Sequence, residues 1–369
     1  MYRIGIITFH CSYNYGSVLQ AFALQNYLET QGYSTRIINY VLTSNFEQYR
    51  LFRTNKYKES LKYFISDLCF FVPNYRRKIN FENFQKKYLS LSEKKFSDDD
   101  NMDSLNAEFD AFICGSDQIW NLDCTNGVNP PYFLNFAQKD KLKISYAPSL
   151  AHKTFSESFL NELKNAIENI DYISIREEST IDAIKGLTDK QIKVVLDPTL
   201  LLDATRYEHV EINPKKNKDY VFVYMLENNS EFINYCNRYS KENNLKIYYL
   251  SQKRMSGLNG ENLFGIKPEE FLGYIKNAQC VITNSFHATV FSIIYHKQFC
   301  TFPTLKSSSR MSDLLRELGL SNRFYDRDFK MNDVIDYDYC DKQLDSLRIE
   351  SQKYLLEALS TLEQKNERK

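Results

Sequence analysis

The first 42 residues, MYRIGIITFHCSYNYGSVLQAFALQNYLETQGYSTRIINYVL (1–42), contain the pattern that decides the fold. Residues 2–9 are a short apolar run that predicts a strand. Residues 17–31 repeat apolar side chains at helical spacing and stop before Gly32, which suits a helix C-cap. Residues 33–42 return to a strand pattern. Such a β-α-β unit indicates a parallel sheet with a right-handed crossover.

The same alternation continues along the chain and predicts two α/β domains. Strand patterns recur at 109–114, 143–147, 172–176, 192–196, 220–226, 246–250, 280–283 and 298–302. Helical patterns occupy 155–169, 177–186, 230–243, 268–277, 286–295 and 308–318. We expect an N-terminal domain over 1–205, a C-terminal domain over 218–340 and a C-terminal helix within 342–369. The polar segment 203–219 would join the domains, and 369 residues is a comfortable length for such a pair.

Residues 44–90 interrupt this alternation with a segment rich in aromatic and basic side chains. Ten lysines and arginines stand there against four acidic residues. One interpretation is a helical hairpin inserted in the N-terminal domain, with a solvated basic face. The other is a surface, over about residues 49–87, that contacts anionic lipid or a lipid-linked acceptor.

Composition argues against several classes of protein. The 47 lysines and arginines balance 47 acidic residues, whereas a general nucleic-acid binder is usually strongly basic. The eight cysteines include no CxxC pair and no zinc-ligand spacing, so we expect reduced thiols, no metal site and a cytoplasmic protein. No run of about 18 apolar residues is present, and the first residues lack the cationic start of a signal peptide.

Three junctions between a predicted strand and the following helix carry polar side chains suited to ligand binding. They are Asn14-Tyr15-Gly16-Ser17, Gly115-Ser116-Asp117-Gln118 and Thr283-Asn284-Ser285-Phe286-His287. In open parallel sheets, ligands bind at the carboxyl ends of strands, where helix N-termini meet the crevice. Each junction alone is equally typical of an N-cap, because Asn, Asp and Ser favour that position. Together they predict at least one site for a phosphate or carboxylate.

His287 and Arg176 are the sharpest single candidates. His287 falls in the first turn of a predicted helix, where an imidazole can donate to an anion or transfer a proton near neutral pH. Arg176 ends a predicted strand and can clamp a carboxylate or phosphate, although a surface salt bridge is equally typical. Residues 306–310, Lys-Ser-Ser-Ser-Arg, add positive charge at another helix start. Asp197 precedes a proline, which favours a structural role as a strand terminator.

The chain has no GxGxxG loop, P-loop, GxSxG elbow or HExxH pair, but it carries six other short motifs in order. They are NYGSVLQ (14–20), FDAFICGSDQIWN (109–121), ISYA (144–147), ISIREE (173–178), VLDPT (195–199) and ITNSFHAT (282–289). Together these motifs resemble the polysaccharide pyruvyl transferase family over about residues 1–320.

The resemblance implies a GT-B-type fold, with two Rossmann-like domains facing a cleft, the acceptor on the N-terminal side and the donor on the C-terminal side. It implies transfer of a pyruvyl group from phosphoenolpyruvate, as co-substrate, to two hydroxyls of a sugar, giving a cyclic ketal. Neither a metal nor a further cofactor is expected. The family serves capsule, cell-wall and exopolysaccharide synthesis.

The resemblance also suggests roles for individual residues. His287 matches the family histidine at the donor site, and Arg176 matches the arginine that faces it. We therefore expect a catalytic pair, His287 and Asp117. The donor-binding residues would be Arg176, Asn284, Ser285, Lys306, Ser308 and Arg310. The acceptor-binding residues would be Asn14, Tyr15, Gly16, Ser17, Ser116, Gln118 and Trp120.

One departure concerns the donor site. Many family members have Arg-Leu-His where this chain has Ser285-Phe286-His287, and Arg310 or Lys306 would replace that arginine. The donor phosphate is expected on the helix N-terminus near Ser285 and its carboxylate on Arg176. A protonated His287 would protonate the methylene carbon or stabilise the leaving phosphate, and Asp117 would take a proton from the sugar.

Three functions are compatible with the sequence. Pyruvyl transfer to a glycan or lipid-linked oligosaccharide is favoured. A GT-B glycosyltransferase with a nucleotide-sugar donor is the alternative, because the donor arginine is missing. A non-catalytic glycan- or membrane-binding protein would depend on residues 50–87 and not on His287. We expect a cytoplasmic location, which would be at the inner face of the membrane if the acceptor is lipid-linked. We also expect the two domains to close on each other about a hinge at residues 203–219. No oligomeric state is predicted.

Overall fold

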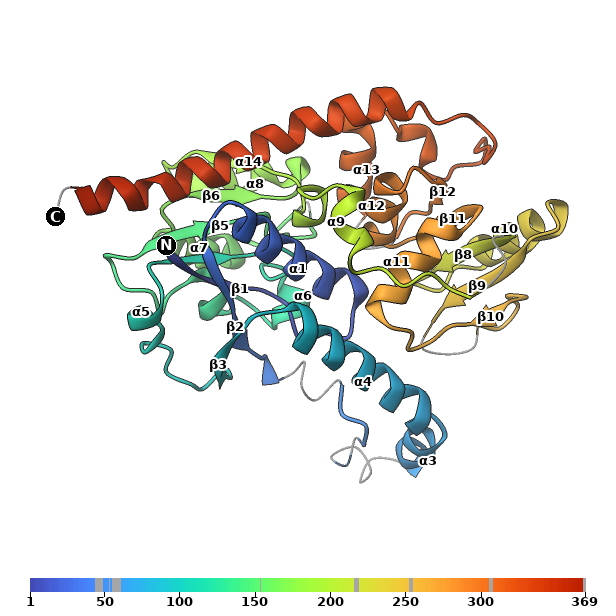
Figure 1. The fold of residues 1–369 in the computed structure, drawn as a ribbon, viewed down its shortest axis with the longest axis horizontal. Coiled ribbons are helices and arrows are strands. Elements are labelled where there is room, and N and C mark those ends of the chain that lie inside the picture. The colour runs from blue at the N-terminus through green and yellow to red at the C-terminus, as the bar shows by residue number, and fades with distance from the viewer. Residues whose placement is uncertain are drawn as a thin grey trace.

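Two parallel sheets of five strands each form the two halves of the chain in a computed structural model (Figure 1). The structure describes residues 1–43, 49–52, 54, 61–152, 154–215, 219–251, 255–304 and 308–367. The N-terminal sheet has the order β3-β2-β1-β4-β5 and the C-terminal sheet the order β10-β9-β8-β11-β12. This architecture confirms the GT-B-type arrangement of two Rossmann-like domains.

The strands are short and mostly buried. In the N-terminal half they are β1 (Arg3–Ile7), β2 (Ser34–Tyr40), β3 (Leu91–Phe96), β4 (Ala111–Cys114) and β5 (Leu142–Ser145), followed by the separate pair β6 (Ile173–Ile175) and β7 (Ile192–Val194). In the C-terminal half they are β8 (Tyr220–Tyr224), β9 (Lys246–Leu250), β10 (Glu261–Asn262), β11 (Cys280–Thr283) and β12 (Gln298–Thr301).

The helices cover these sheets. They are α1 (Tyr15–Thr30), α3 (Leu61–Cys69), α4 (Phe71–Tyr88), α5 (Leu105–Glu108), α6 (Leu122–Thr125), α7 (Glu157–Ile167), α8 (Ile181–Ile184), α9 (Ala204–Glu208), α10 (Ser230–Glu242), α11 (Pro268–Asn277), α12 (Phe286–Ile294), α13 (Ser308–Glu317) and α14 (Tyr337–Glu367). No helix in the described part combines the length and apolar character needed to cross a bilayer.

Helix α1 lies between the two domains. Thirteen of its sixteen residues are buried, as is typical of a helix that is apolar on all sides. One continuous hydrophobic cluster joins α1 residues such as Leu24 to C-terminal residues such as Phe291. Gly32 has a φ of +86°, in agreement with the predicted C-cap. Along α1, the two domains therefore share one hydrophobic core.

The predicted insertion forms two helices over most of its described residues, and residues 49–52 are turn and bend. Helices α3 and α4 project from the N-terminal domain, with α3 farthest from the sheets (Figure 1). Residues 44–48, 53 and 55–60 of the segment lie outside the described residues. Helix α4 also contacts the C-terminal domain, because the Asn80 side-chain amide donates to the Gly265 carbonyl at 2.7 Å. The insertion therefore bridges both domains.

Two segments differ from expectation. The start of the predicted linker 203–219 forms α9, where the buried Tyr207 donates to the Thr199 carbonyl at 2.8 Å. Helix α14 begins earlier than predicted and runs across both halves of the molecule (Figure 1). It packs on the N-terminal domain, because the Tyr354 hydroxyl donates to the Ser145 carbonyl at 3.0 Å.

Candidate active site

The N-termini of α1 and α12 meet at the boundary between the domains. A Cβ atom added to Gly16 would lie 2.0 Å from Nδ1 of His287, so the α1 backbone rests directly on the imidazole. The Asn14 side chain caps α1 through the N–H groups of Gly16 and Ser17, and Ser285 caps α12. Both helices therefore direct the positive ends of their dipoles to one place, which favours an anion there.

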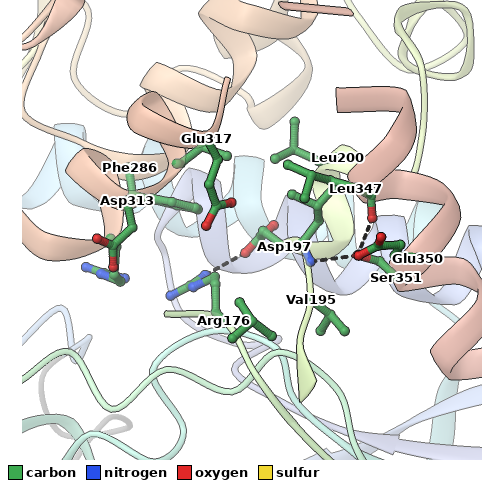
Figure 2. Close-up of a pocket in the computed structure, with 14 residues that line it drawn as sticks. Arg176, Val195, Asp197, Leu200, Phe286, Asp313, Glu317, Leu347, Glu350 and Ser351 are labelled. Atoms are coloured by element: carbon green, nitrogen blue, oxygen red, sulfur yellow. Dashed lines mark hydrogen bonds and ion pairs between the residues drawn. The ribbon is translucent and has the colours of Figure 1, made fainter. Parts of the chain in front are cut away.

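Asp197 collects contacts from both domains beside His287. Its Oδ2 accepts a hydrogen bond from Nη1 of Arg176 at 2.5 Å (Figure 2) and lies 3.5 Å from Nε2 of His287. Its Oδ1 accepts from the Thr199 hydroxyl at 2.6 Å. Burial disfavours the ionised carboxylate, but the contacts with His287 and Arg176 outweigh burial and hold the pKa of Asp197 well below its usual range. A fixed negative charge thus orients the imidazole and the guanidinium.

Glu177 is a second buried carboxylate in the same cluster. Its Oε1 accepts from the Ser149 hydroxyl and lies 3.9 Å from Nε of both Arg176 and Arg310. Burial raises the pKa of Glu177, although both arginines oppose the shift. Burial and repulsion by Arg176 lower the pKa of Arg310 to about 10. Both guanidinium groups lie over the Phe286 ring, at 4.7 and 5.6 Å from its centroid.

Several buried nitrogen atoms of this cluster have no hydrogen-bond partner. They are Nε and Nη2 of Arg176, Nε of Arg310 and Nε2 of His287. A buried polar group left without a partner costs about 1–3 kcal/mol, and more when it is charged. Carboxylate oxygens of Glu177 and Asp197 lie 3.5–3.9 Å from three of these atoms, and Oε2 of Glu177 is itself buried without a hydrogen-bond partner. An anionic ligand with several oxygen atoms would supply the acceptors that the nitrogen atoms lack, so the cluster has the chemistry of a phosphate or carboxylate site.

A cavity of about 420 Å³ opens beside this cluster, between the domains. The predicted site residues that line it are Asn14, Ser17, Asp117, Gln118, Ser285, His287 and Arg310. Arg176 lies behind it and lines a smaller cavity of about 40 Å³, which α13 and α14 close with Glu317 and Ser351 (Figure 2). Arg310 lines both cavities and is the arginine that reaches the larger one among the described residues.

Asp117 occupies a strained position on the rim of the larger cavity. Its φ is +66°, a region that non-glycine residues rarely adopt. The Ser17 hydroxyl donates to Oδ2 of Asp117 at 2.5 Å, which joins the first and second predicted loops. Backbone conformations of this kind are often retained at functional sites, and the acid-base role of Asp117 stays a prediction.

Other predicted site residues do not line this cavity. Asn284 uses its amide to bind the backbone of Leu226 and Glu227. Trp120 is 2% exposed and donates from its indole to the Tyr132 carbonyl, so core packing prevents its expected contact with an acceptor.

The remaining predicted residues have supporting positions. Ser116 is buried and donates to the Ala147 carbonyl, and Tyr15 stacks on Phe271 with ring centroids 4.7 Å apart. Ser308 begins α13, but its side chain is not described, and Lys306 lies outside the described residues.

Asp197 and Glu177 are functional candidates that the sequence analysis missed. Asp197 was interpreted as a strand terminator because a proline follows it, although the structure places it at the centre of the cluster. Its presence in the VLDPT motif was the available signal. No group of three or more His, Cys, Asp or Glu side chains in the described residues is arranged to hold a metal ion.

The fold and this interdomain cluster define a GT-B-type protein with a candidate anion site between its domains. A UDP-N-acetylglucosamine 2-epimerase from Neisseria meningitidis, solved with bound UDP-GlcNAc, is similar in fold, with a TM-score of 0.54, 7% identity, and 98% of this chain and 100% of that chain covered. An enzyme from Listeria monocytogenes assigned as the same epimerase gives a TM-score of 0.51 and 7% identity, over 96% and 89% of the two chains. No curated protein matches the chain in sequence.

The family is defined by sequence. The family model of polysaccharide pyruvyl transferases matches residues 14–305. The chain therefore belongs to the polysaccharide pyruvyl transferase family.

Proposed function

We propose that this transferase moves a pyruvyl group from phosphoenolpyruvate to two hydroxyls of a sugar in a surface glycan or its precursor. One observation carries the proposal: unpartnered nitrogen atoms of Arg176, Arg310 and His287 are buried together where two helix N-termini meet. Phosphoenolpyruvate carries two anionic groups on one small molecule. Preorganised cations and dipoles act most strongly on such charge in a site that excludes water.

The donor would lie with its phosphate at the N-terminus of α12, near Ser285 and His287. Its carboxylate would pair with Arg310, the arginine that lines the larger cavity. In this arrangement, Arg310 supplies the positive charge that many family members carry on an arginine at the position of Ser285. Arg176 would contribute positive charge from behind the larger cavity without binding the donor directly, because its Nη1 already donates to Asp197. Neither a metal nor a cofactor takes part in the proposed reaction.

The proposed reaction adds one proton to the methylene carbon and exchanges phosphate for two sugar oxygens. A protonated His287 would deliver the proton, which makes the methyl group and leaves positive charge at the adjacent carbon. One sugar hydroxyl would attack that carbon while Asp117 accepts its proton. Phosphate would then leave and take up the proton of the second hydroxyl as this oxygen closes the ketal. The proton held by Asp117 would then pass through solvent to His287, which restores both groups for the next turnover. With that return, two hydroxyl protons enter the reaction, and one ends on carbon and one on phosphate.

The direct test is an assay of the purified enzyme with phosphoenolpyruvate and a panel of oligosaccharides. Pyruvyl transfer adds one pyruvate to an acceptor with loss of one water, which mass spectrometry detects, and releases one phosphate per ketal. His287→Ala and Arg310→Ala should abolish both signals. Full activity in both variants would overturn the assignment. Glycosyl transfer from a nucleotide sugar by the native protein would favour the alternative function.

The insertion supports a further proposal, contact with an anionic membrane that carries the acceptor on the cytoplasmic side. Of the thirteen large apolar side chains that are exposed in the described part, seven lie between Phe52 and Tyr75. An exposed apolar patch beside basic residues is typical of a surface that lies on anionic lipid.

Sedimentation with vesicles of phosphatidylglycerol and phosphatidylcholine tests this contact. Val72→Asp changes a side chain of the insertion that is 72% exposed. Val334→Asp is the control, because Val334 is 86% exposed and lies outside the insertion. Only the Val72 variant should lose binding. Binding that is absent in the native protein, or equal in both variants, would contradict the proposal.

A further inference from the structure

A second cavity, of about 620 Å³, adjoins the candidate active site. The two cavities share Asn14, Tyr49 and Leu226 in their linings, so one space continues into the other. The second cavity extends along the domain boundary, away from the arginine cluster. It reaches the carboxyl ends of β8 and β9, near Met225 and Ser251. This is the edge of a parallel sheet at which ligands bind.

Aromatic rings from both domains form the walls of the second cavity. Tyr13, Tyr15 and Tyr49 come from the N-terminal half, and Tyr224 and Phe264 come from the C-terminal half. The rings of Tyr15 and Tyr224 meet edge to face at 5.8 Å. Aromatic side chains from both domains therefore surround this cavity, and such side chains are typical of sites that bind ring-shaped ligands.

The polar groups of this cavity are few and carry little charge. Asn14, Asn228, Ser251 and Ser256 offer amide and hydroxyl groups, and no carboxylate stands among the described lining residues. Among the lining residues that the structure describes, Arg77 of α4 is the one charged group, and residues 252–254, between the lining residues Ser251 and Met255, lie outside that description. That guanidinium donates to the Tyr13 carbonyl and lies 5.5–5.9 Å from four ring centroids.

We propose that the second cavity binds the sugar residue next to the one that reacts, so that the acceptor is an oligosaccharide of at least two linked sugars. This inference rests on the proposed function, because it takes the first cavity as the place of pyruvyl transfer. A sugar ring presents apolar C–H faces to aromatic rings and hydroxyls to amide and serine groups. The continuity of the two cavities allows one linked acceptor to occupy both. The insertion, through Arg77, therefore helps to select the acceptor.

The experiment compares monosaccharides with disaccharides in the absence of phosphoenolpyruvate. The probes are methyl glycosides of glucose, galactose, mannose and N-acetylglucosamine, each beside a 1,4-linked disaccharide that carries the same terminal sugar. Binding is followed by saturation-transfer NMR and by titration. Phe264→Ala removes a half-buried wall, and Asn228→Trp adds bulk at an exposed rim position. Tyr339→Ala, on α14 and outside both linings, is the control.

At least one disaccharide should bind the native protein tenfold or more tightly than its monosaccharide. Both cavity variants should lose that advantage, and the control should keep it. The rise in melting temperature with phosphoenolpyruvate should be unchanged in all three variants. The inference would be overturned if the native protein bound monosaccharides and disaccharides with equal affinity. It would also be overturned if the cavity variants lost affinity for both to the same extent. The inference would also be overturned if UDP-GlcNAc displaced the disaccharide and if Phe264→Ala weakened the binding of UDP-GlcNAc. The second cavity would then bind a nucleoside and not a sugar of the acceptor.

The same experiment separates this inference from the proposed function. Failure of phosphoenolpyruvate to stabilise the native protein counts against pyruvyl transfer alone. The comparison of disaccharide with monosaccharide still decides the role of the second cavity, because it requires no donor.

Discussion

Gly16 and His287 meet across the boundary between the two domains, with no room for a side chain on residue 16. The Cβ of an alanine there would lie 2.0 Å from Nδ1 and 2.6 Å from Cε1 of the imidazole. Gly16 belongs to the first turn of α1 and His287 to the first turn of α12. The glycine is thus part of the surface that fixes the orientation of the proposed proton donor.

Gly16→Ala should therefore displace His287 and reduce pyruvyl transfer by more than tenfold. We expect overpacking to cost about 1–3 kcal/mol of unfolding free energy. Gly186→Ala is the matched control, because no atom lies within 4 Å of the position of its Cβ. Steady-state kinetics and urea denaturation measure the two effects. A Gly16→Ala enzyme with native activity would show that the imidazole can move without consequence.

Asp197→Asn should be the most destabilising of the conservative changes at the site. Asparagine keeps the shape of the side chain but removes the negative charge that lies 2.5 Å from Nη1 of the buried Arg176. Breaking a buried ion pair costs about 3–5 kcal/mol, whereas an exposed pair contributes about 0–1 kcal/mol. Asp345→Asn removes the partner of Arg348 on the exposed side of α14 and is the control. Similar denaturation midpoints for the two variants would refute the central role of Asp197.

Ser351→Ala tests how α14 supports the loop that carries Asp197. The Ser351 hydroxyl accepts from the backbone N–H of Leu196 at 2.9 Å, one residue before Asp197. Alanine leaves that buried N–H without a partner, which costs about 1–3 kcal/mol. Ser360→Ala, at a half-buried serine whose hydroxyl donates to the Glu357 carbonyl of its own helix, should change stability by less than half as much. Urea denaturation compares the two, and equal losses would contradict this role for α14.

Glu317 should make the protein less stable as the pH rises from about 4 to 7. Burial, followed by repulsion from Glu178, raises the pKa of Glu317 to about 7, against about 4.3 in an unfolded chain. The folded state therefore binds more protons than the unfolded state between these values, so the unfolding free energy falls as the pH rises. Glu317→Gln should raise the melting temperature at pH 8 and leave it nearly unchanged at pH 4. An equal shift at both pH values would contradict the raised pKa.

Apolar strands and amphipathic helices were predictable from the sequence because their periodicity is strong. Strand β3 was missed because LSEKKF is a polar edge strand, and β10 was missed because it has only two residues. The predicted helix at 177–186 instead breaks into α8 and two short 3₁₀ turns. Glycine and proline placement predicted the helix ends, including Gly319, which has a φ of +69°.

The candidate site was only partly predictable because contacts distant in sequence decide it. Asn14, Asp117 and His287 lie in strand-to-helix loops, a position that local sequence marks. The centrality of Asp197 depends on partners 21 and 90 residues away along the chain, which periodicity cannot indicate. The family resemblance suggested Trp120 as an acceptor residue, but packing against Phe133 holds it in the core.

Thermal unfolding with phosphoenolpyruvate tests the central claim most directly. A ligand at 100 times its dissociation constant should stabilise the folded state by about 2.7 kcal/mol. We expect phosphoenolpyruvate, and not UDP-GlcNAc, to raise the melting temperature of the native protein. The shift should disappear in Arg310→Ala and persist in Arg316→Ala, whose side chain is 57% exposed on the same helix. No shift with phosphoenolpyruvate, or an undiminished shift in Arg310→Ala, would contradict the account.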